Sequence, residues 1–294
     1  MQLLPPTQPA ELPTEALLAR LRCRRAGIDL AADQGAQAPA AEAVNWVYRR
    51  LNGRLRTRLT PFLDLLAMRN LVLTLRYTLA GEKPPAAALH SALLAAPLQR
   101  LAAAGGDAEG TVARLETALA RDYPFVSGLT INYRRQGPGG VEQQLTAGIL
   151  QHGLARPGSV LLKGALRYLV DVRNCLMVHK LWRWQFSQAP PLVAGGSIAA
   201  TSLRRIWATR DSDRLARLVA HLAGEPCREG KTMALEQCLL HGMTRLVRQA
   251  GRDPLGLGVI IDYLWRAQLM AHNQVLRQTL AADRDELLGE VLLL

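Results

Sequence analysis

The chain has 294 residues, of which 49% are hydrophobic, 20% are charged and 5% are aromatic, and its formal net charge at pH 7 is +12. This composition excludes disordered and collagen-like chains, and a chain of this length can bury a core without disulfide bonds. Abundant Leu and Ala with few aromatic residues favour helices over strands. The positive charge fits nucleic acid, an anionic membrane or acidic protein partners. Only four of the 36 basic residues are lysines, and such an excess of arginine can also reflect the codon composition of the gene.

The sequence favours a cytoplasmic chain with reduced thiols. The N-terminal residues include three prolines and Glu11 instead of the apolar core of a secretory signal. No run of eighteen apolar residues is present, so any membrane association is expected to be peripheral. The cysteines lie too far apart for a disulfide framework. They are Cys23, Cys175, Cys227 and Cys238.

Helical periodicity and Gly or Pro stops predict roughly ten to fourteen helices. The predicted segments are 14–26, a helix starting at 42, 59–79, 86–103, 110–120, 141–154, 160–186, 201–222, 231–249 and 255–280. The last of these has Asp253 at the N-cap and Pro254 at the first helical position. Residues 31–41 are predicted to form a surface loop.

The segment 123–140 is predicted to be an irregular connection or a short hairpin. It is rich in Gly and Pro, which interrupt regular helices. Leu129, Ile131 and Tyr133 alternate with polar residues, as in a strand. This is the only hint of β structure in the sequence.

Three long apolar helices share a basic residue followed by an asparagine. The pairs are Arg69-Asn70, Arg173-Asn174 and His272-Asn273. Six residues after each asparagine stand Arg76, Lys180 and Thr279. In the first two copies a Pro-Pro pair closes the helix. A spacing of about one hundred residues predicts triplication of a small helical module.

The asparagine in these helices has two interpretations. Its amide carries two N–H donors and one acceptor, so it can tie the helix to the backbone of a neighbouring loop. Asp171 precedes Asn174 by three residues and lies on the same side of the helix, which makes a local polar cluster possible. The alternative interpretation is a ligand site.

At these residues the chain resembles the C subunit of V/A-type ATPases, called subunit d in the eukaryotic vacuolar enzyme. The matching stretches are Phe62-Leu63-Asp64 through Arg76-Tyr77, Arg167 through Asn174, and Asp253-Pro254-Leu255-Gly256-Leu257-Gly258 through Tyr263 and Asn273. The Gly195-Gly196 turn, followed by Leu203 and Ile206, also resembles the family.

The resemblance implies an all-α fold of three pseudo-symmetric helical-bundle modules arranged as a funnel. The modules are expected at 1–105, 106–200 and 201–294, with terminal helices able to exchange between them. The expected structural repeat residues are Asp64, Arg69, Asn70, Arg76, Asp171, Arg173, Asn174, Lys180, Asp253, Pro254, Tyr263 and Asn273.

The resemblance further implies a non-catalytic rotor subunit, peripheral on the cytoplasmic face of a membrane. It would join the central stalk of a V/A-type ATPase to the proteolipid ring during proton or sodium transport. No catalytic, cofactor-binding or metal-binding residues are expected, and neither is a small-molecule substrate. Exposed arginines can pair with carboxylates on the stalk or with anionic headgroups.

Enzymatic and metal-binding patterns find little support. The stretch Gly224 to Gly230-Lys231-Thr232 has five residues between its glycines, where a phosphate-binding loop has four. A possible metal set fits no common zinc spacing. It comprises His221, Cys227, Cys238 and His241. No constellation typical of a hydrolase is present.

The alternative function is that of a basic helical nucleic-acid-binding or scaffold protein. Aromatic residues adjoin basic ones only locally, at Tyr48, Tyr133 and Trp182-Arg183-Trp184. A stacking platform would need a longer series, so nucleic acid is not the expected partner.

Overall fold

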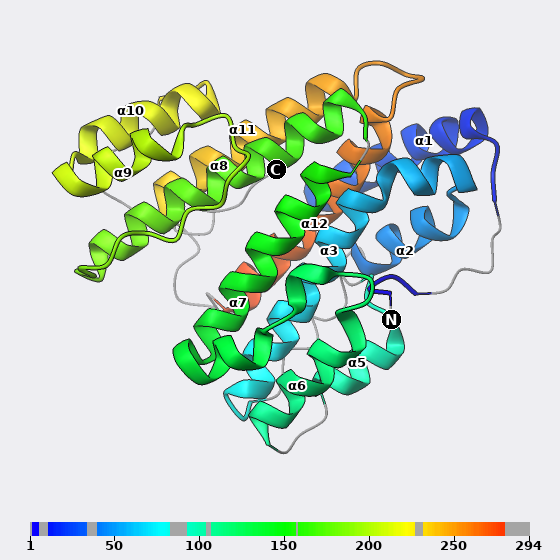
Figure 1. Cartoon of the computed structure of the whole chain (residues 1–294). Coiled ribbons are helices and arrows are strands. Elements are labelled where there is room, and N and C mark those ends of the chain that lie inside the picture. The colour runs from blue at the N-terminus through cyan, green and yellow to red at the C-terminus, as the bar shows by residue number, and fades with distance from the viewer. Residues whose placement is uncertain are drawn as a thin grey trace. The chain divides into compact units, whose positions relative to one another are not determined.

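The computed structural model describes residues 2–5, 11–33, 40–82, 93–103, 107–156, 158–226 and 232–279 (Figure 1). Within these ranges all regular secondary structure is helical, with no strand, which confirms the predicted all-α class. The α-helices are α1 (Thr14–Asp33), α2 (Ala40–Arg50), α3 (Gly53–Leu79), α5 (Ala96–Ala103), α6 (Ala108–Leu119), α7 (Leu129–Ala155), α8 (Val160–Arg183), α9 (Ala200–Thr209), α10 (Ser212–Ala223), α11 (Thr232–Ala250) and α12 (Gly258–Thr279). A short 3-10 helix, η1, spans Pro124–Val126.

The chain divides into two compact units, and the first contains a closed ring of four helices. This unit comprises Met1–Gly158 and Arg266–Val275. Helix α3 packs against α5 and α7, and α6 packs against the same two helices. We call this arrangement the α3 ring. Helix α3 is buried on several sides, which explains its apolar residues at nearly every position.

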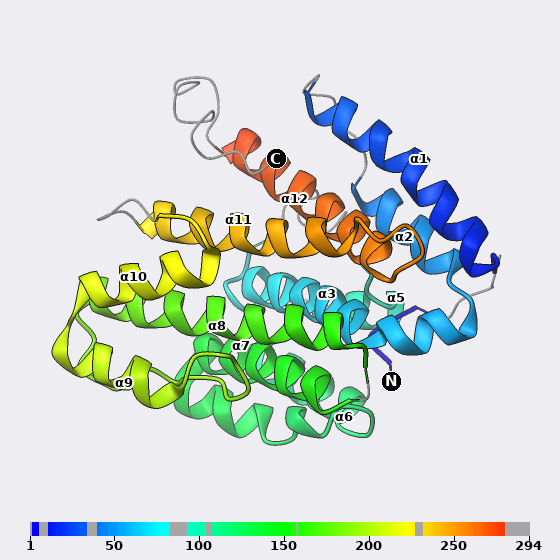
Figure 2. The same ribbon diagram turned by 90° about the horizontal axis from the view of Figure 1, so that it is seen from above.

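The second unit, formed mainly by Ser159–Trp265, contains a ring with the same order of helices. Here α8 packs against α9 and α11, and α10 packs against the same two helices (Figure 2). We call this the α8 ring. Among the described α-helices of each ring, a long helix is followed by two short ones and a second long one, with η1 also between α6 and α7, and residues 83–92 fall outside this description. The core of the α8 ring consists of Cys175, Val178, Leu203, Ile206, Leu215, Val219, Ala223, Leu235, Cys238 and Leu239.

A close helix crossing fixes the α8 ring. The Tyr168 hydroxyl on α8 donates a 2.8 Å hydrogen bond to the Leu239 carbonyl on α11. A Cβ added at Gly242 would lie 2.1 Å from the Tyr168 hydroxyl oxygen and 2.7 Å from Cα of Ala223. Such distances are well inside van der Waals contact, so only glycine allows the three helices to approach this closely.

The prediction for residues 123–140 was wrong. Most of this segment is helical, since α7 begins at Leu129 and contains the residues that alternate like a strand. The helix tolerates its Gly-Pro sequence because Gly137 takes a non-helical conformation (φ 64°, ψ −158°), which kinks the chain before Pro138.

Several predicted helix ends also differ, since α3 begins at Gly53 and not at residue 59, and α8 ends at Arg183 and not at residue 186. Helix α1 continues through Gly27 to Asp33, so residues 31–33 of the predicted loop are helical, while 34–39 lie outside the described residues. Helix α12 begins at Gly258, not at Pro254. Asp253 instead starts a turn, in which its carboxylate accepts the Leu255 N–H at 3.1 Å. This turn is packed tightly against the end of α11, because a Cβ at Gly258 would lie 2.1 Å from the Ala250 carbonyl oxygen.

The remaining expectations about the fold concern its larger organisation. The division into three modules and their arrangement as a funnel stay predictions. The Pro84-Pro85 stop lies outside the described residues. Among the helices as far as they are described, none combines the length and the hydropathy needed to span a bilayer.

We expect Gly242→Ala to lower the free energy of unfolding by about 1–3 kcal/mol, because the added methyl group must displace Tyr168 or α10. Gly164→Ala on α8 is the matched control. A Cβ at that position has nothing within 4 Å. It should raise the free energy of unfolding by about 0.5–1 kcal/mol through helix propensity. Chemical denaturation measures both, and equal effects of the two changes would refute the close crossing.

Candidate functional site

The buried aspartates and asparagines lie on three of the long helices. Among the described residues, three aspartates and three asparagines are buried, and α3, α8 and α12 hold one of each. The pairs are Asp64 with Asn70, Asp171 with Asn174, and Asp262 with Asn273. All three asparagines are those of the predicted repeat. A buried carboxylate or amide is stable only if it is hydrogen-bonded, so the partners of these side chains define the candidate site.

On α8 the pair anchors the segment that connects α8 to α9. The Asn174 amide donates a 2.8 Å hydrogen bond to the Val193 carbonyl and accepts one of 2.8 Å from the Val193 N–H. The Asp171 carboxylate accepts the N–H groups of Ser197 at 2.8 Å and Ile198 at 3.0 Å. We call these four contacts the α8 latch. The helix-to-loop tie predicted for the amide is therefore present at Asn174.

The glycines of the predicted Gly195-Gly196 turn make the α8 latch possible. Gly195 has φ 99°, a left-handed conformation that suits glycine. A Cβ at Gly196 would lie 2.0 Å from Asp171 Oδ1, so the backbone can reach the carboxylate only without a side chain. Burial raises the pKa of Asp171, although the Ile198 and Ser197 hydrogen bonds act to lower it.

The corresponding asparagine on α3 is paired differently. Asn70 is buried, but its Nδ2 atom has no hydrogen-bond partner among the described residues. Arg69 beside it is exposed. Arg76 binds both oxygens of Glu142 on α7, with Nε 2.7 Å from Oε1 and Nη2 2.8 Å from Oε2. This repeat residue therefore helps to join α3 to α7.

Asp64 on α3 meets partners that are distant in the sequence. Its carboxylate accepts the Tyr123 hydroxyl at 3.2 Å and pairs with Arg156 Nη1 at 3.1 Å. The Tyr123 oxygen in turn accepts the Leu3 N–H at 3.4 Å. Burial raises the pKa of Asp64 to about 6, against the lowering effect of Arg156 and Tyr123. The Asp64 carboxylate thus connects the N-terminal segment and the end of α7 to α3.

The other repeat residues occupy varied surroundings. Tyr263 on α12 is buried, as is Asn273, whereas Asp253 and Pro254 are exposed in the preceding turn. Arg173 is half-buried, and burial lowers its pKa. The Lys180 carbonyl accepts the Trp184 N–H at 3.0 Å, at the end of α8.

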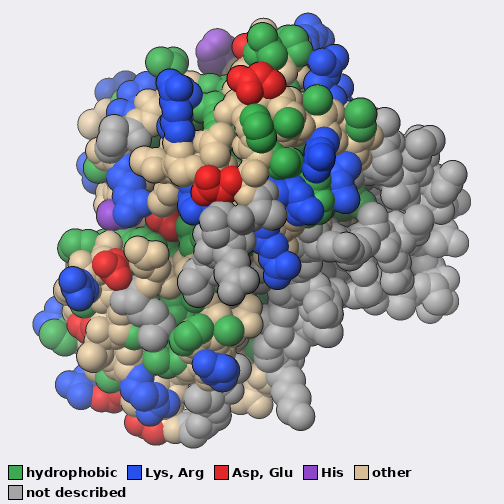
Figure 3. Space-filling model, turned by 90° about the vertical axis from the view of Figure 1, so that its right-hand side faces the viewer, with side chains coloured by type: hydrophobic (Ala, Val, Ile, Leu, Met, Phe, Trp, Pro, Cys, Tyr) green, Lys and Arg blue, Asp and Glu red, His purple; other side chains and the backbone are tan. Residues whose placement is uncertain are grey.

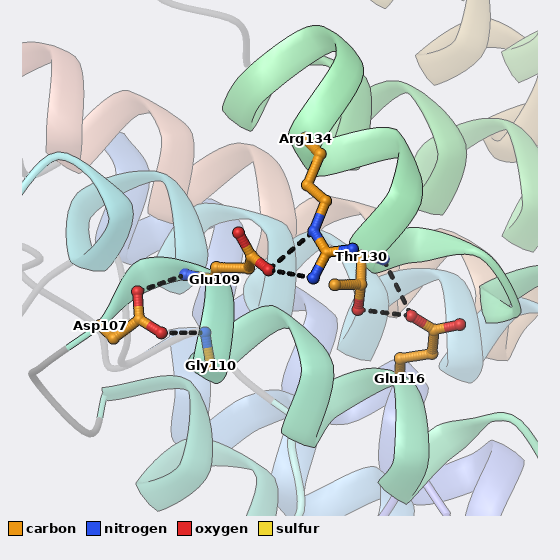
Figure 4. A network of polar contacts seen from close by, with 6 residues as sticks. All are labelled: Asp107, Glu109, Gly110, Glu116, Thr130 and Arg134. Carbon is orange, nitrogen blue, oxygen red and sulfur yellow. Dashed lines mark hydrogen bonds and ion pairs between the residues drawn. The ribbon is translucent and has the colours of Figure 1, made fainter.

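A further polar network, missed by the sequence analysis, starts α6 and α7 (Figure 4). The Glu116 carboxylate accepts the N–H groups of Gly128 at 2.5 Å and Thr130 at 2.8 Å, so it caps the N-terminus of α7 from α6. Burial acts to raise the pKa of Glu116, but hydrogen bonds from Thr130 and Gly128 hold it below its usual value. Asp107 caps α6, and Glu109 pairs with Arg134. No local sequence pattern predicts that the N-terminus of α7 is capped by a side chain twelve residues earlier.

The groups considered for chemistry do not form a reactive site in the described part of the chain. No set of three His, Cys, Asp or Glu residues there could hold a metal ion. His241 pairs with Glu225 at 3.3 Å, and Cys227 lies outside the described residues. Burial raises the pKa of the Cys175 thiol to about 12, so this sulfur is not a nucleophile at neutral pH. The candidate phosphate-binding stretch also falls partly outside the described residues.

Comparison with known proteins adds no family assignment. No protein-family model matches the chain. No curated protein matches it either. The arrangement described above therefore carries the functional argument, together with the resemblance in the sequence.

We expect Asn174→Leu to lower the free energy of unfolding by about 2–4 kcal/mol, because both backbone groups of Val193 would lose their partner. Asn70→Leu is the matched control, since it removes a buried amide whose Nδ2 is unpaired. Its effect should stay within about 1 kcal/mol. Urea denaturation of the two variants checks the difference, and equal losses would show that the α8 latch contributes nothing specific.

The pKa of Asp64 predicts a pH dependence of stability. Because the folded chain binds this proton more tightly than the unfolded chain, stability relative to Asp64→Asn should fall as the pH rises from about 4 to about 6. The expected change is about 2–3 kcal/mol. Denaturation of both proteins at pH 4 and pH 7 measures it, with the exposed Asp213→Asn as control. A difference independent of pH would contradict the elevated pKa.

Proposed function

We propose that the chain is a non-catalytic rotor subunit of a V/A-type ATPase. In this role it is a socket of three pseudo-symmetric helical modules arranged as a funnel. It receives the central stalk and rests on the proteolipid ring at the cytoplasmic face of the membrane. The subunit transmits rotation during proton or sodium transport and performs no reaction itself.

The observation that carries the proposal is the placement of one buried aspartate and one buried asparagine on each of α3, α8 and α12. The aspartate and the asparagine are six residues apart on α3, three on α8 and eleven on α12. Buried polar groups are costly, so their occurrence on all three helices supports a repeated module. The matching order of long and short helices in the α3 ring and the α8 ring agrees with internal duplication. Both features suit the repeated module that the resemblance implies.

The internal ties suit a body that transmits torque. Close-packed helices have low compressibility, so they pass force on with little deformation. The α8 latch holds the α8–α9 connection at four points, and Asp64 holds three segments together. Connections that are fixed in this way reduce local unfolding, which would otherwise absorb part of the transmitted torque.

The basic surface suits acidic partners. Residues 20–25 and 49–58 hold nine arginines and no acidic residue. Six of these arginines are exposed: Arg20, Arg22, Arg24, Arg49, Arg54 and Arg58. Guanidinium groups of Arg24 and Arg50 lie 4.2 and 4.4 Å from the centre of the Trp46 ring, which brings arginines of α1 and α2 together. On the face drawn in Figure 3, Lys and Arg side chains outnumber Asp and Glu side chains over the described residues.

The same contacts disfavour the alternative of single-stranded nucleic acid at this surface. The two guanidinium groups already lie over the Trp46 ring, so it is not free to stack on a base. Tyr48 is buried and donates its hydroxyl to the Pro5 carbonyl at 2.8 Å. Carboxylates of a protein partner fit the arginine forks without an aromatic platform.

Co-expression with stalk and ring subunits of the same source tests the proposal. The chain should co-purify with both and should be required for their association. Because arginine pairs on the surface are screened by salt, retention on the stalk should weaken severalfold between 50 mM and 500 mM NaCl. A folded chain that binds neither subunit, or that binds double-stranded DNA more tightly than either, would refute the proposal.

A further inference from the structure

Two large aromatic side chains are exposed to solvent just after the end of α8. Trp184 is 63% exposed and Phe186 is 51% exposed. The whole chain has five Trp and three Phe residues, so two of these eight lie within a three-residue stretch. Exposed apolar side chains that cluster in this way mark interaction surfaces more often than single ones do.

The backbone holds this aromatic pair in a fixed position. Two residues after the last residue of α8, Gln185 takes the left-handed conformation at φ 54°, a position where glycine is usual. The Trp184 N–H donates to the Lys180 carbonyl at 3.0 Å, and the Phe186 N–H donates to the Leu181 carbonyl at 3.0 Å. Both aromatic residues are therefore presented from a capped helix end and not from a loose loop.

A second pair of aromatic residues ties the end of α9 to the same place. The rings of Trp182 and Trp207 stack with centroids 6.3 Å apart and planes 12° from parallel. Trp182 Nε1 also donates to the Trp207 carbonyl at 3.3 Å. The C-terminal end of α9, with its basic residues, is thereby held beside the end of α8.

Most charged side chains around the aromatic pair are cationic, although Asp211 and the exposed Asp213 follow directly after α9. From residue 172 to residue 210 the sequence contains no Asp or Glu, while α8 and α9 contribute several basic side chains over this stretch. The exposed ones near the two helix ends are Arg183, Arg204, Arg205 and Arg210. Residues 184–189 are exposed and uncharged. An uncharged aromatic tip is thus flanked by arginines.

We propose that Trp184 and Phe186 insert into the headgroup region of an anionic lipid bilayer, with the arginines of α8 and α9 against the lipid phosphates. Trp and Phe beside cations are typical of surfaces that lie in a membrane interface. A nucleic acid is less well matched, because Trp182 and Trp207 are stacked on each other, which leaves only the aromatic pair to stack on bases. The inference rests on the proposed function in placing the chain at a membrane, and it deepens that function by naming residues.

Vesicle flotation with the full chain tests the inference. The protein should bind vesicles of phosphatidylcholine with 30% phosphatidylglycerol and should bind pure phosphatidylcholine far more weakly. The double variant Trp184→Ala, Phe186→Ala should lower the partition coefficient on anionic vesicles about tenfold or more. Leu255→Ala is the matched control, because Leu255 is 73% exposed in the same unit. It should leave binding unchanged, and circular dichroism should show all three proteins folded.

Several results would overturn the inference. The first is a folded chain that does not bind anionic vesicles, and the second is a double variant that binds them as tightly as the unmodified chain. Equal losses in the control would show that any exposed apolar residue suffices. Binding of a single-stranded oligonucleotide that depends on Trp184 and displaces the protein from vesicles would assign the surface to nucleic acid. The vesicles contain no ATPase subunits, so this failure is distinct from a failure to co-purify with the stalk and ring.

Discussion

The fold depends on how apolar helices accommodate buried polar side chains. Asp171 and Asn174 lie within one turn of α8, and both are fully covered. Without partners they would destabilise the helix packing, but the chain returns after α8 and supplies backbone groups at Val193, Ser197 and Ile198. The α8 latch consequently fixes where α9 begins, and α9 in turn closes the ring with α10 and α11.

In the first unit the same requirement is met at Asp64 but not fully at Asn70. Asp64 is compensated by side chains, whereas the Nδ2 atom of Asn70 is unpaired among the described residues. In the proposed modules the buried polar side chains would therefore have different partners, while each module keeps a long helix. A stiff assembly of such helices is what a coupling subunit between two rotating parts requires.

The fold class and one tertiary contact could be predicted from the sequence. Composition and periodicity predicted the all-α class, and the donor and acceptor capacity of an amide predicted the Asn174 contact. The missed features depend on partners far apart in the chain. Asp64 meets Tyr123 and Arg156, which are 59 and 92 residues away, and no local pattern reveals such pairings. Tertiary packing also overrode local signals, since α7 runs through Gly137-Pro138 and Asp253 forms a turn before α12.

The central claim is that three related helices build an adaptor at the rotor axis. Electron cryo-microscopy of a rotary ATPase assembled from subunits of the same source tests it most directly. The account predicts density for this chain between the central stalk and the proteolipid ring, with α3, α8 and α12 related by an approximate threefold rotation about the axis. An assembled enzyme that lacks the chain at this junction, or in which the three helices are unrelated by rotation, would contradict it.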